Sequence, residues 1–288
     1  MTEPAWLDRA EYPFAPRWLD VPAGRMHYVD EGQGRPIVFV HGTPDWSFGW
    51  RHLIKALLPQ YRCIAPDSLG FGLSDKPQDY SYTPAEQAAN LRRLIDGLGL
   101  KDITLVLHDF GGPFGLAYAL DKPANVRSVA LLNTWMWSLR GDPHYERFGR
   151  LFGGAFGRFL FLRLNFSVRV IMKHAIADKA RFPPRIQDQY MRPFARAADR
   201  VATHAYARAL LGAGEWYDGL WRRREKIRDI SALILWGMND QAFRQEELER
   251  LQMVFSHKRT ACFHDAGHFP QEERSERVVS LVEEFLAG

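Results

Sequence analysis

The stretch Leu105–Gly112, with the sequence LVLHDFGG, decides the fold of this chain. The strand-forming residues Ile103–Leu107 stop abruptly at His108 and Asp109, and two glycines and a helical pattern follow. A sharp turn from a strand into a helix presents one reactive side chain at its apex, an arrangement called a nucleophile elbow. The apex residue is Asp109, whose carboxylate can attack a saturated carbon that bears a leaving group. The product of that attack is an alkyl ester that water must hydrolyse.

Length and composition favour one α/β domain with an insertion. The chain has 288 residues, of which 46% are hydrophobic and 25% charged, as in ordinary globular proteins. No apolar run approaches the ~18 residues of a membrane span, and the first residues lack the apolar core of a signal peptide. The only cysteines, Cys63 and Cys262, are interpreted as buried free thiols, which fits a cytoplasmic protein. No metal-ligand spacing or phosphate-binding loop occurs, so we expect neither a metal nor a cofactor.

Strand-like segments alternate with helical patterns along most of the chain. The expected strands are Met26–Asp30, Pro36–Val40, Arg62–Pro66, Ile103–Leu107, Val126–Leu132, Ser231–Trp236 and Thr260–Phe263. Residues 135–228 interrupt this alternation with aromatic, arginine-rich, helical sequence. The pattern predicts a mostly parallel sheet with helices on both faces, built by residues 1–134 and 229–288, and a helical cap at 135–228.

Positive charge is concentrated in the predicted cap. Residues 135–228 hold 19 Lys and Arg against 8 Asp and Glu, whereas the rest of the chain holds 19 against 26. This excess either attracts an anionic substrate or product, or belongs to an ordinary solvated helical surface. The basic residues are dispersed and accompany no nucleic-acid-binding motif, so we expect no nucleic acid partner.

Three candidate catalytic residues follow predicted strands. Asp109 is at the elbow, Asp240 follows Ser231–Trp236, and His268 follows Thr260–Phe263. Open α/β sheets place their sites at the carboxyl ends of strands, and the order nucleophile, acid, base is the one used with this elbow. Asp109 is then the nucleophile, His268 activates water, and Asp240 orients the imidazole.

Two backbone N–H groups, those of Thr43 and Phe110, are expected to form the oxyanion hole that stabilises the charge on the ester carbonyl. His108 is interpreted as a support for the elbow, and His41 as a brace for the loop that contains Thr43. Taken singly, each residue has an ordinary structural explanation; for example, an aspartate after a buried strand is often a helix N-cap.

The blocks HGTPDWSFGWR (41–51), LHDFGGPFGLAYAL (107–120), LNTWMW (132–137), WGMND (236–240) and DAGHFPQEE (265–273) resemble those of haloalkane dehalogenases in the α/β-hydrolase superfamily. The resemblance implies the α/β-hydrolase fold and the roles given above to Asp109, Asp240 and His268. Some relatives carry the acid after the preceding strand. Asn133 occupies that place here and cannot be the carboxylate.

The leaving-group site departs from this family at two positions. Members usually have Trp after the nucleophile, where this chain has Phe110, and many have Asn where it has Thr43. Each lost charge-assisted hydrogen bond to the halide would cost about 1.5–3 kcal/mol. A tryptophan of the cap or its hinge (Trp135, Trp137, Trp216 or Trp221) could replace the missing donor, although apolar lining between cap and core is the more ordinary role for any one of them. The tentative leaving-group residues are therefore Thr43, Phe110, Trp135 and Trp137.

The predicted activity is cleavage of carbon–halogen bonds of haloalkanes by water, with halide as a product and no membrane partner. The alternative is an epoxide hydrolase that uses the same Asp109 with a cap tyrosine (Tyr145, Tyr190, Tyr206 or Tyr217) as the acid. A non-catalytic ligand receptor would be favoured by a damaged triad, and an ester hydrolase would need Ser or Cys at the elbow. The oligomeric state stays open.

Overall fold

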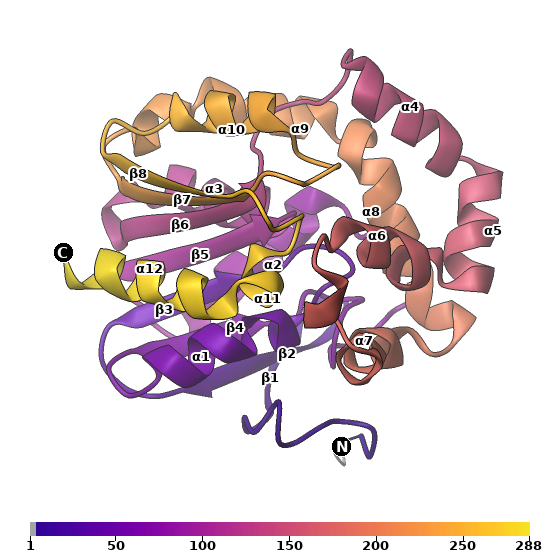
Figure 1. Ribbon diagram of the computed structural model, residues 1–288, viewed down its shortest axis with the longest axis horizontal. Coiled ribbons are helices and arrows are strands. Elements are labelled where there is room, and N and C mark those ends of the chain that lie inside the picture. Colours follow the sequence, from indigo (N-terminus) through magenta and orange to yellow (C-terminus); the bar gives the residue numbers. More distant parts are fainter. Residues whose placement is uncertain (1–3) are drawn as a thin grey trace.

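A computed structural model describes residues 4–288 and has a mixed sheet at its centre (Figure 1). Within the described residues the sheet has eight strands in the order β1-β2-β4-β3-β5-β6-β7-β8. The strands are β1 Arg17–Val21, β2 Gly24–Glu31, β3 Pro36–Val40, β4 Arg62–Pro66, β5 Ile103–Asp109, β6 Val126–Thr134, β7 Ser231–Gly237 and β8 Lys258–Phe263. Strands β3 to β8 run parallel, while β2 is antiparallel to both β1 and β4.

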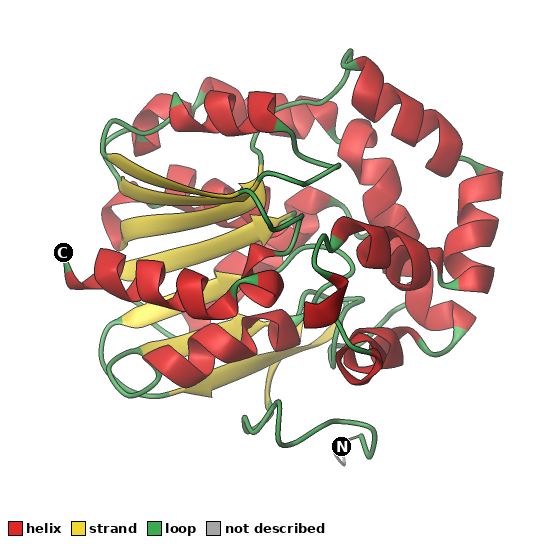
Figure 2. Ribbon diagram, in the orientation of Figure 1, coloured by secondary structure: helices red, strands yellow, loops and turns green. Residues whose placement is uncertain are grey.

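Helices cover both faces of this sheet, as Figure 2 shows. They are α1 Arg51–Leu57, α2 Pro84–Gly97, α3 Gly111–Asp121, α10 Gln245–Gln252, α11 Pro270–Glu273 and α12 Ser275–Ala287. Helices α1 and α12 lie in front of the sheet in Figure 1, and α2 and α3 lie behind it. Helix α2 begins at a capping box, in which Thr83 accepts from the Glu86 N–H and Glu86 accepts from the Thr83 N–H.

The chain between β6 and β7 is helical, and most of it lies beyond the carboxyl ends of the parallel strands (Figure 1). Its α-helices, called the inserted helices below, are α4 Pro143–Phe152, α5 Ala155–Leu164, α6 Lys173–Ala175, α7 Pro184–Met191, α8 Val201–Gly212 and α9 Gly214–Arg222. A π-helical turn at Ser167–Met172 precedes α6. Because parallel strands all end at one edge, the inserted helices face the loops in which the candidate site residues lie.

The predicted α/β fold is confirmed, and the expected limits of β3 and β4 match the structure. These strands are buried, so their apolar runs carry a clear signal. Strand β1 was not expected, because it is a short edge strand whose sequence, RWLDV, shows no continuous apolar run. Both cysteines are free, but the expectation that Cys262 is buried was wrong, since it is exposed on the edge strand β8. No helix among residues 4–288 is long and apolar enough to cross a membrane.

A buried ion pair joins α1 to α11, the short helix that follows His268. Arg51 donates to both carboxylate oxygens of Glu272 at 2.7 and 2.6 Å. The hydroxyl of Tyr190, on the inserted helix α7, donates to Glu272 Oε2 at 2.7 Å. Arg51 and Glu272 are 1% and 4% exposed, so the charge of each is compensated mainly by the other.

Arg51→Met should lower the free energy of unfolding by about 3–5 kcal/mol, because it leaves the Glu272 carboxylate buried without its counter-charge. In the double variant Arg51→Met/Glu272→Gln no charge is stranded, and the amide that replaces the Glu272 carboxylate can still accept from Tyr190. Its stability, measured by urea denaturation, should exceed that of the single variant. Equal or lower stability of the double variant would contradict this explanation.

Candidate active site

The elbow holds Asp109 in a left-handed backbone conformation, with φ of 50°. Such a conformation is costly for a residue other than glycine, so the surroundings must enforce it. The Thr134 hydroxyl donates to the Asp109 carbonyl oxygen at 2.6 Å. A Cβ at Gly111 would lie 2.0 Å from the Val40 carbonyl oxygen, and one at Gly42 would lie 2.3 Å from Asp109 Cβ. Both glycines are therefore required for the close approach of the β3 loop to the elbow.

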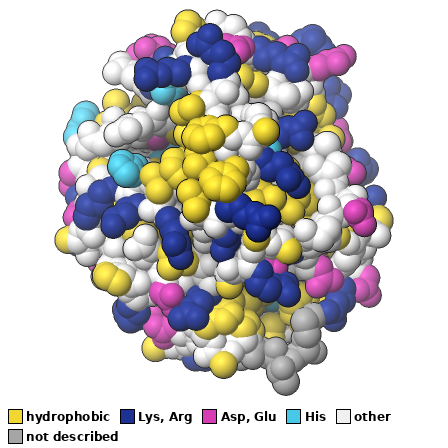
Figure 3. All heavy atoms as spheres, turned by 90° about the vertical axis from the view of Figure 1, so that its right-hand side faces the viewer, with side chains coloured by type: hydrophobic (Ala, Val, Ile, Leu, Met, Phe, Trp, Pro, Cys, Tyr) yellow, Lys and Arg dark blue, Asp and Glu magenta, His cyan; other side chains and the backbone are white. Residues whose placement is uncertain are grey.

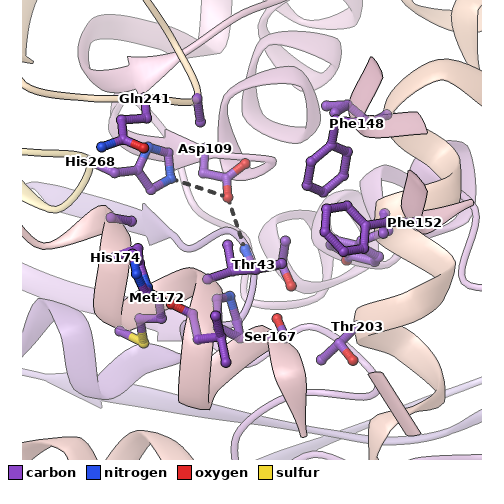
Figure 4. A pocket seen from close by; sticks show the side chains of 18 of the residues that line it. Thr43, Asp109, Phe148, Phe152, Ser167, Met172, His174, Thr203, Gln241 and His268 are labelled. Carbon is purple, nitrogen blue, oxygen red and sulfur yellow. Dashed lines mark hydrogen bonds and ion pairs between the residues drawn. The ribbon is translucent and has the colours of Figure 1, made fainter. Parts of the chain in front are cut away.

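Three side chains from three strand ends meet at this edge of the sheet. His268 Nδ1 is 2.8 Å from Asp240 Oδ2, and His268 Nε2 is 3.5 Å from Asp109 Oδ2. The backbone N–H of Thr43 donates to the same Asp109 oxygen at 3.2 Å. Figure 4 shows the two contacts of Asp109, with His268 and with Thr43, and the second carboxylate oxygen of Asp109 directed into a cavity. Asp109, Asp240 and His268 are 5%, 7% and 5% exposed, so their interactions are only weakly screened by water.

Asn133 holds the Asp240 carboxylate in place, a role that the sequence did not reveal. Its Nδ2 donates to Asp240 Oδ2 at 2.8 Å and to the Gly237 carbonyl oxygen at 3.1 Å, and its Oδ1 accepts from the Gly237 N–H at 2.9 Å. The Ala242 N–H donates to Asp240 Oδ1 at 2.7 Å. The signal was available, because Asn133 is the next-to-last residue of β6, the strand beside β7, and parallel neighbours end at one edge.

The two carboxylates set the protonation of His268. Burial alone lowers the pKa of this imidazole, but the charge of Asp240 and the hydrogen bonds with Asp109 and Asp240 outweigh burial and raise it to about 10. His108 behaves in the opposite way: burial and the neighbouring His268 hold its pKa well below the usual range. A neutral His108 donates from Nε2 to the His268 carbonyl oxygen at 2.8 Å, which fixes the backbone of the loop after β8 at His268.

His41 supports the β3 loop through both ring nitrogens. Its Nε2 accepts from the Ser68 N–H at 2.9 Å, so its Nδ1 carries the proton and donates to the Gly42 carbonyl oxygen at 2.7 Å. Burial lowers the pKa of His41, which is consistent with this neutral form. The hydrogen bonds agree with the interpretation of His41 as a brace beside Thr43.

A cavity of about 410 Å³ separates Asp109 from the inserted helices. Most of the lining that the insertion contributes is apolar: Phe148, Phe152, Phe161, Phe166, Val170 and Leu210. Thr43, Phe110 and His268 also line it. Its size and lining suit a small apolar molecule held against the Asp109 carboxylate.

Three lining side chains carry buried hydroxyls with no hydrogen-bond partner among residues 4–288: Thr43, Tyr145 and Tyr206. The Glu247 side chain is near that of Tyr145, and the Ser68 side chain is near that of Tyr206. The Tyr206 ring lies 4.6 Å from that of Phe110, between centroids. Burial raises the pKa of Tyr206 well above its ordinary value, and the charge of Asp109 adds to the rise. The phenol therefore remains a hydrogen-bond donor.

The two tryptophans expected near the leaving group lie in different places. Trp135 packs against Phe110 at 4.9 Å, between ring centroids, and its buried indole N–H has no partner within the described part of the chain. It is not among the lining residues. Trp137 packs instead against Trp221 at 5.3 Å and under the Arg250 guanidinium at 4.7 Å. Of the four residues expected near the leaving group, Thr43 and Phe110 therefore line the cavity beside Asp109, and the two tryptophans do not.

Sequence comparison finds an α/β hydrolase fold family match over residues 35–275. Haloalkane dehalogenase 2 of Mycobacterium tuberculosis is 34% identical over 273 residues, covering 94% of each chain. A cis-3-alkyl-4-alkyloxetan-2-one decarboxylase of Shewanella oneidensis is 32% identical, covering 95% of this chain and 89% of the relative.

Structure comparison gives a consistent result. The crystal structure of the haloalkane dehalogenase DatA from Agrobacterium tumefaciens C58 superimposes with a TM-score of 0.84 at 27% identity, covering 95% of this chain and 96% of the other. The sequence and structural matches both extend over nearly the whole chain. The protein accordingly belongs to the haloalkane dehalogenase family of α/β-hydrolase-fold enzymes.

Proposed function

We propose that the protein hydrolyses carbon–halogen bonds of haloalkanes, with Asp109 as the nucleophile. The observation that carries the proposal is a carboxylate, rather than a hydroxyl, at the elbow, with one oxygen bound by the Thr43 N–H and the other directed into an apolar cavity. The free oxygen attacks the carbon, and the carbon–halogen bond breaks with its electron pair on the halide. An alkyl ester of Asp109 remains on the enzyme.

In the second step, water attacks the carbonyl carbon of that ester. His268 accepts the proton of this water, and Asp240 stabilises the resulting imidazolium. The backbone N–H groups of Thr43 and Phe110 stabilise the oxyanion. When the intermediate collapses, His268 returns a proton to the departing alkoxide, giving the alcohol and restoring the Asp109 carboxylate. Overall, one haloalkane and one water yield an alcohol, a proton and a halide.

Ester formation also prepares the base. In the free enzyme both Asp109 and Asp240 raise the pKa of His268, so the imidazole is protonated near neutral pH. The ester removes the negative charge of Asp109 and leaves only Asp240 to support the imidazolium. The pKa of His268 then falls, and the neutral imidazole becomes available when a base is required.

For the departing halide, we propose the hydroxyls of Thr43 and Tyr206 as donors. Phe110 has no N–H to offer in its side chain, whereas these two hydroxyls line the cavity without partners among the described residues. Tyr145 also lines the cavity with an unpartnered hydroxyl, but its ring contacts Phe243, whereas that of Tyr206 contacts Phe110 beside Asp109. Trp135 packs against the Phe110 ring, but neither Trp135 nor Trp137 lines the cavity, so neither is proposed as a donor to the halide. The inserted helices would act as the cap that excludes water from this site.

Two other reactions fit parts of the site. Epoxide opening could use the Tyr206 hydroxyl as the acid, but none of the relatives named above is an epoxide hydrolase. Decarboxylation of a cis-3,4-dialkyl oxetan-2-one is favoured by the Shewanella relative and by Phe110, since no halide has to be bound. This second candidate is tested by offering the enzyme such an oxetanone alongside the haloalkanes.

Asp109→Ala should abolish halide release from short bromo- and chloroalkanes, a loss of at least about 10³-fold in kcat, because the nucleophile is removed. Asp265→Ala is the matched control: this carboxylate is exposed, pairs with Arg274 and lies three residues before His268. It should keep wild-type activity. Halide release by folded Asp109→Ala would refute the assigned nucleophile. No halide release by the wild type, together with conversion of the oxetanone, would replace the proposed reaction.

Tyr206→Phe should slow the first step by roughly 10- to 100-fold, because a hydrogen bond to a charged group contributes about 1.5–3 kcal/mol. The loss should be larger for chloroalkanes than for iodoalkanes, since chloride needs more stabilisation. Tyr217→Phe is the control, because the Tyr217 hydroxyl is also buried and unpartnered among the described residues but does not line the cavity. Equal effects of the two variants, or no dependence on the halogen, would argue against Tyr206 as a donor.

A further inference from the structure

The outer face of α4 and α5 exposes large apolar side chains. Of the five large apolar side chains that are exposed among residues 4–288, four lie in this part of the chain: Leu151 (50% exposed), Phe156 (61%), Phe159 (55%) and Leu164 (49%). We call these four residues the apolar patch. Helix α5 lies at the outer edge of the inserted helices in Figure 1, and Figure 3, which views that side, shows apolar side chains gathered at its centre.

The spacing along α5 explains why these side chains face outward. Phe156, Phe159 and Arg163 are separated by three and four residues and therefore share one helical face. Gly157 and Phe161 point inward, where Phe161 packs against Phe152 with ring centroids 6.0 Å apart and lines the cavity. Helix α5 is thus apolar on its inner face, which packs on the core, and also on its outer face, which does not.

Unpaired cations occupy the same stretch of the chain as the apolar patch. Residues 147–177 contain no acidic residue and six basic ones: Arg147, Arg150, Arg158, Arg163, Arg169 and Lys173. All six are exposed. Within the described chain none of them forms an ion pair, whereas Arg181, Arg185 and Arg192, further along the insertion, each do. Figure 3 shows basic side chains around the central apolar area. This face therefore needs a partner that is both anionic and apolar.

We propose that this face docks on the surface of an anionic lipid bilayer. A short helix with exposed phenylalanine, leucine and arginine inserts its apolar side chains at the headgroup boundary, while the cations bind the anionic headgroups. A second copy of the chain is a poorer occupant, because a two-fold contact would set this cationic face against itself. The proposal is independent of the chemistry at Asp109.

This inference revises the expectation of no membrane partner, which rested on the absence of a long apolar run. No described helix spans a membrane, and docking requires none. It also gives the basic excess of residues 135–228 a different use from attracting an anionic substrate.

Co-sedimentation with vesicles tests the proposal. The full chain should bind vesicles of phosphatidylcholine with one third phosphatidylglycerol, should bind pure phosphatidylcholine weakly, and should be released by salt. Arg158→Glu/Arg163→Glu should weaken binding by roughly 25-fold, or about fivefold for each cation removed. Phe156→Ser/Phe159→Ser should weaken it by about tenfold or more, because less apolar surface inserts.

Two controls alter the same residue types elsewhere on the surface. Met253→Ser removes the remaining exposed large apolar side chain of the described residues (74% exposed), and Arg127→Glu reverses an exposed cation paired with Asp102. Both should bind like the wild type. The substituted residues Phe156, Arg158, Phe159 and Arg163 do not line the cavity, so halide release in solution should survive in every variant. If the wild type itself releases no halide, that result contradicts the proposed reaction and leaves the docking proposal unaffected.

Three results would overturn the docking proposal. One is the absence of binding to the anionic vesicles. Another is equal binding by wild type, patch variants and controls. The third is a dimer in sedimentation velocity that Phe156→Ser/Phe159→Ser dissociates, without lipid binding, which would make the patch an interface between copies of the chain.

Discussion

His268 lies between two buried carboxylates, those of Asp109 and Asp240. The balance of charge among these three side chains constrains the loops that surround them. One imidazolium offsets only one of the two negative charges, and an uncompensated buried carboxylate is costly. Backbone and amide donors stabilise the remaining charge: the Thr43 N–H on Asp109, and Asn133 and the Ala242 N–H on Asp240. The β3 loop, the end of β6 and the loop after β7 must therefore stay in register with the elbow.

The apolar lining of the cavity makes the solvation of charge a problem for the substrate as well as for the carboxylates. In a dry cavity a carboxylate is poorly solvated, which favours its attack on carbon, but the leaving halide is poorly solvated as well. A site that protects its nucleophile from water must therefore supply donors at the opposite end of the reacting bond. With Phe110 beside the elbow, the unpartnered hydroxyls of Thr43 and Tyr206 are the donors that we propose for this role.

How much could be predicted from the sequence depended on whether a feature is local. Pro36–Val40 and Arg62–Pro66 are continuous apolar runs, so their limits were predicted correctly, and the elbow motif located Asp109. The edge strand β1 and the exposed Cys262 were missed, since edge positions give weak patterns. Tyr206 could not be singled out among the tyrosines of residues 135–228. Its place depends on how α8 packs over Phe110, which no local pattern encodes. The apolar patch could not be predicted either, because α5 is apolar on both its inner and its outer face, so the sequence pattern does not show which face is exposed.

The central claim is that water attacks the Asp109 ester and not the substrate carbon. A single turnover in oxygen-18 water, with enzyme in excess over haloalkane, tests it most directly. The account predicts that the alcohol contains ordinary oxygen, taken from Asp109, and that mass spectrometry of the peptide with Asp109 finds the heavy isotope there. Heavy oxygen in the alcohol and none in Asp109 would instead mean direct displacement by water activated by His268, and would contradict the account.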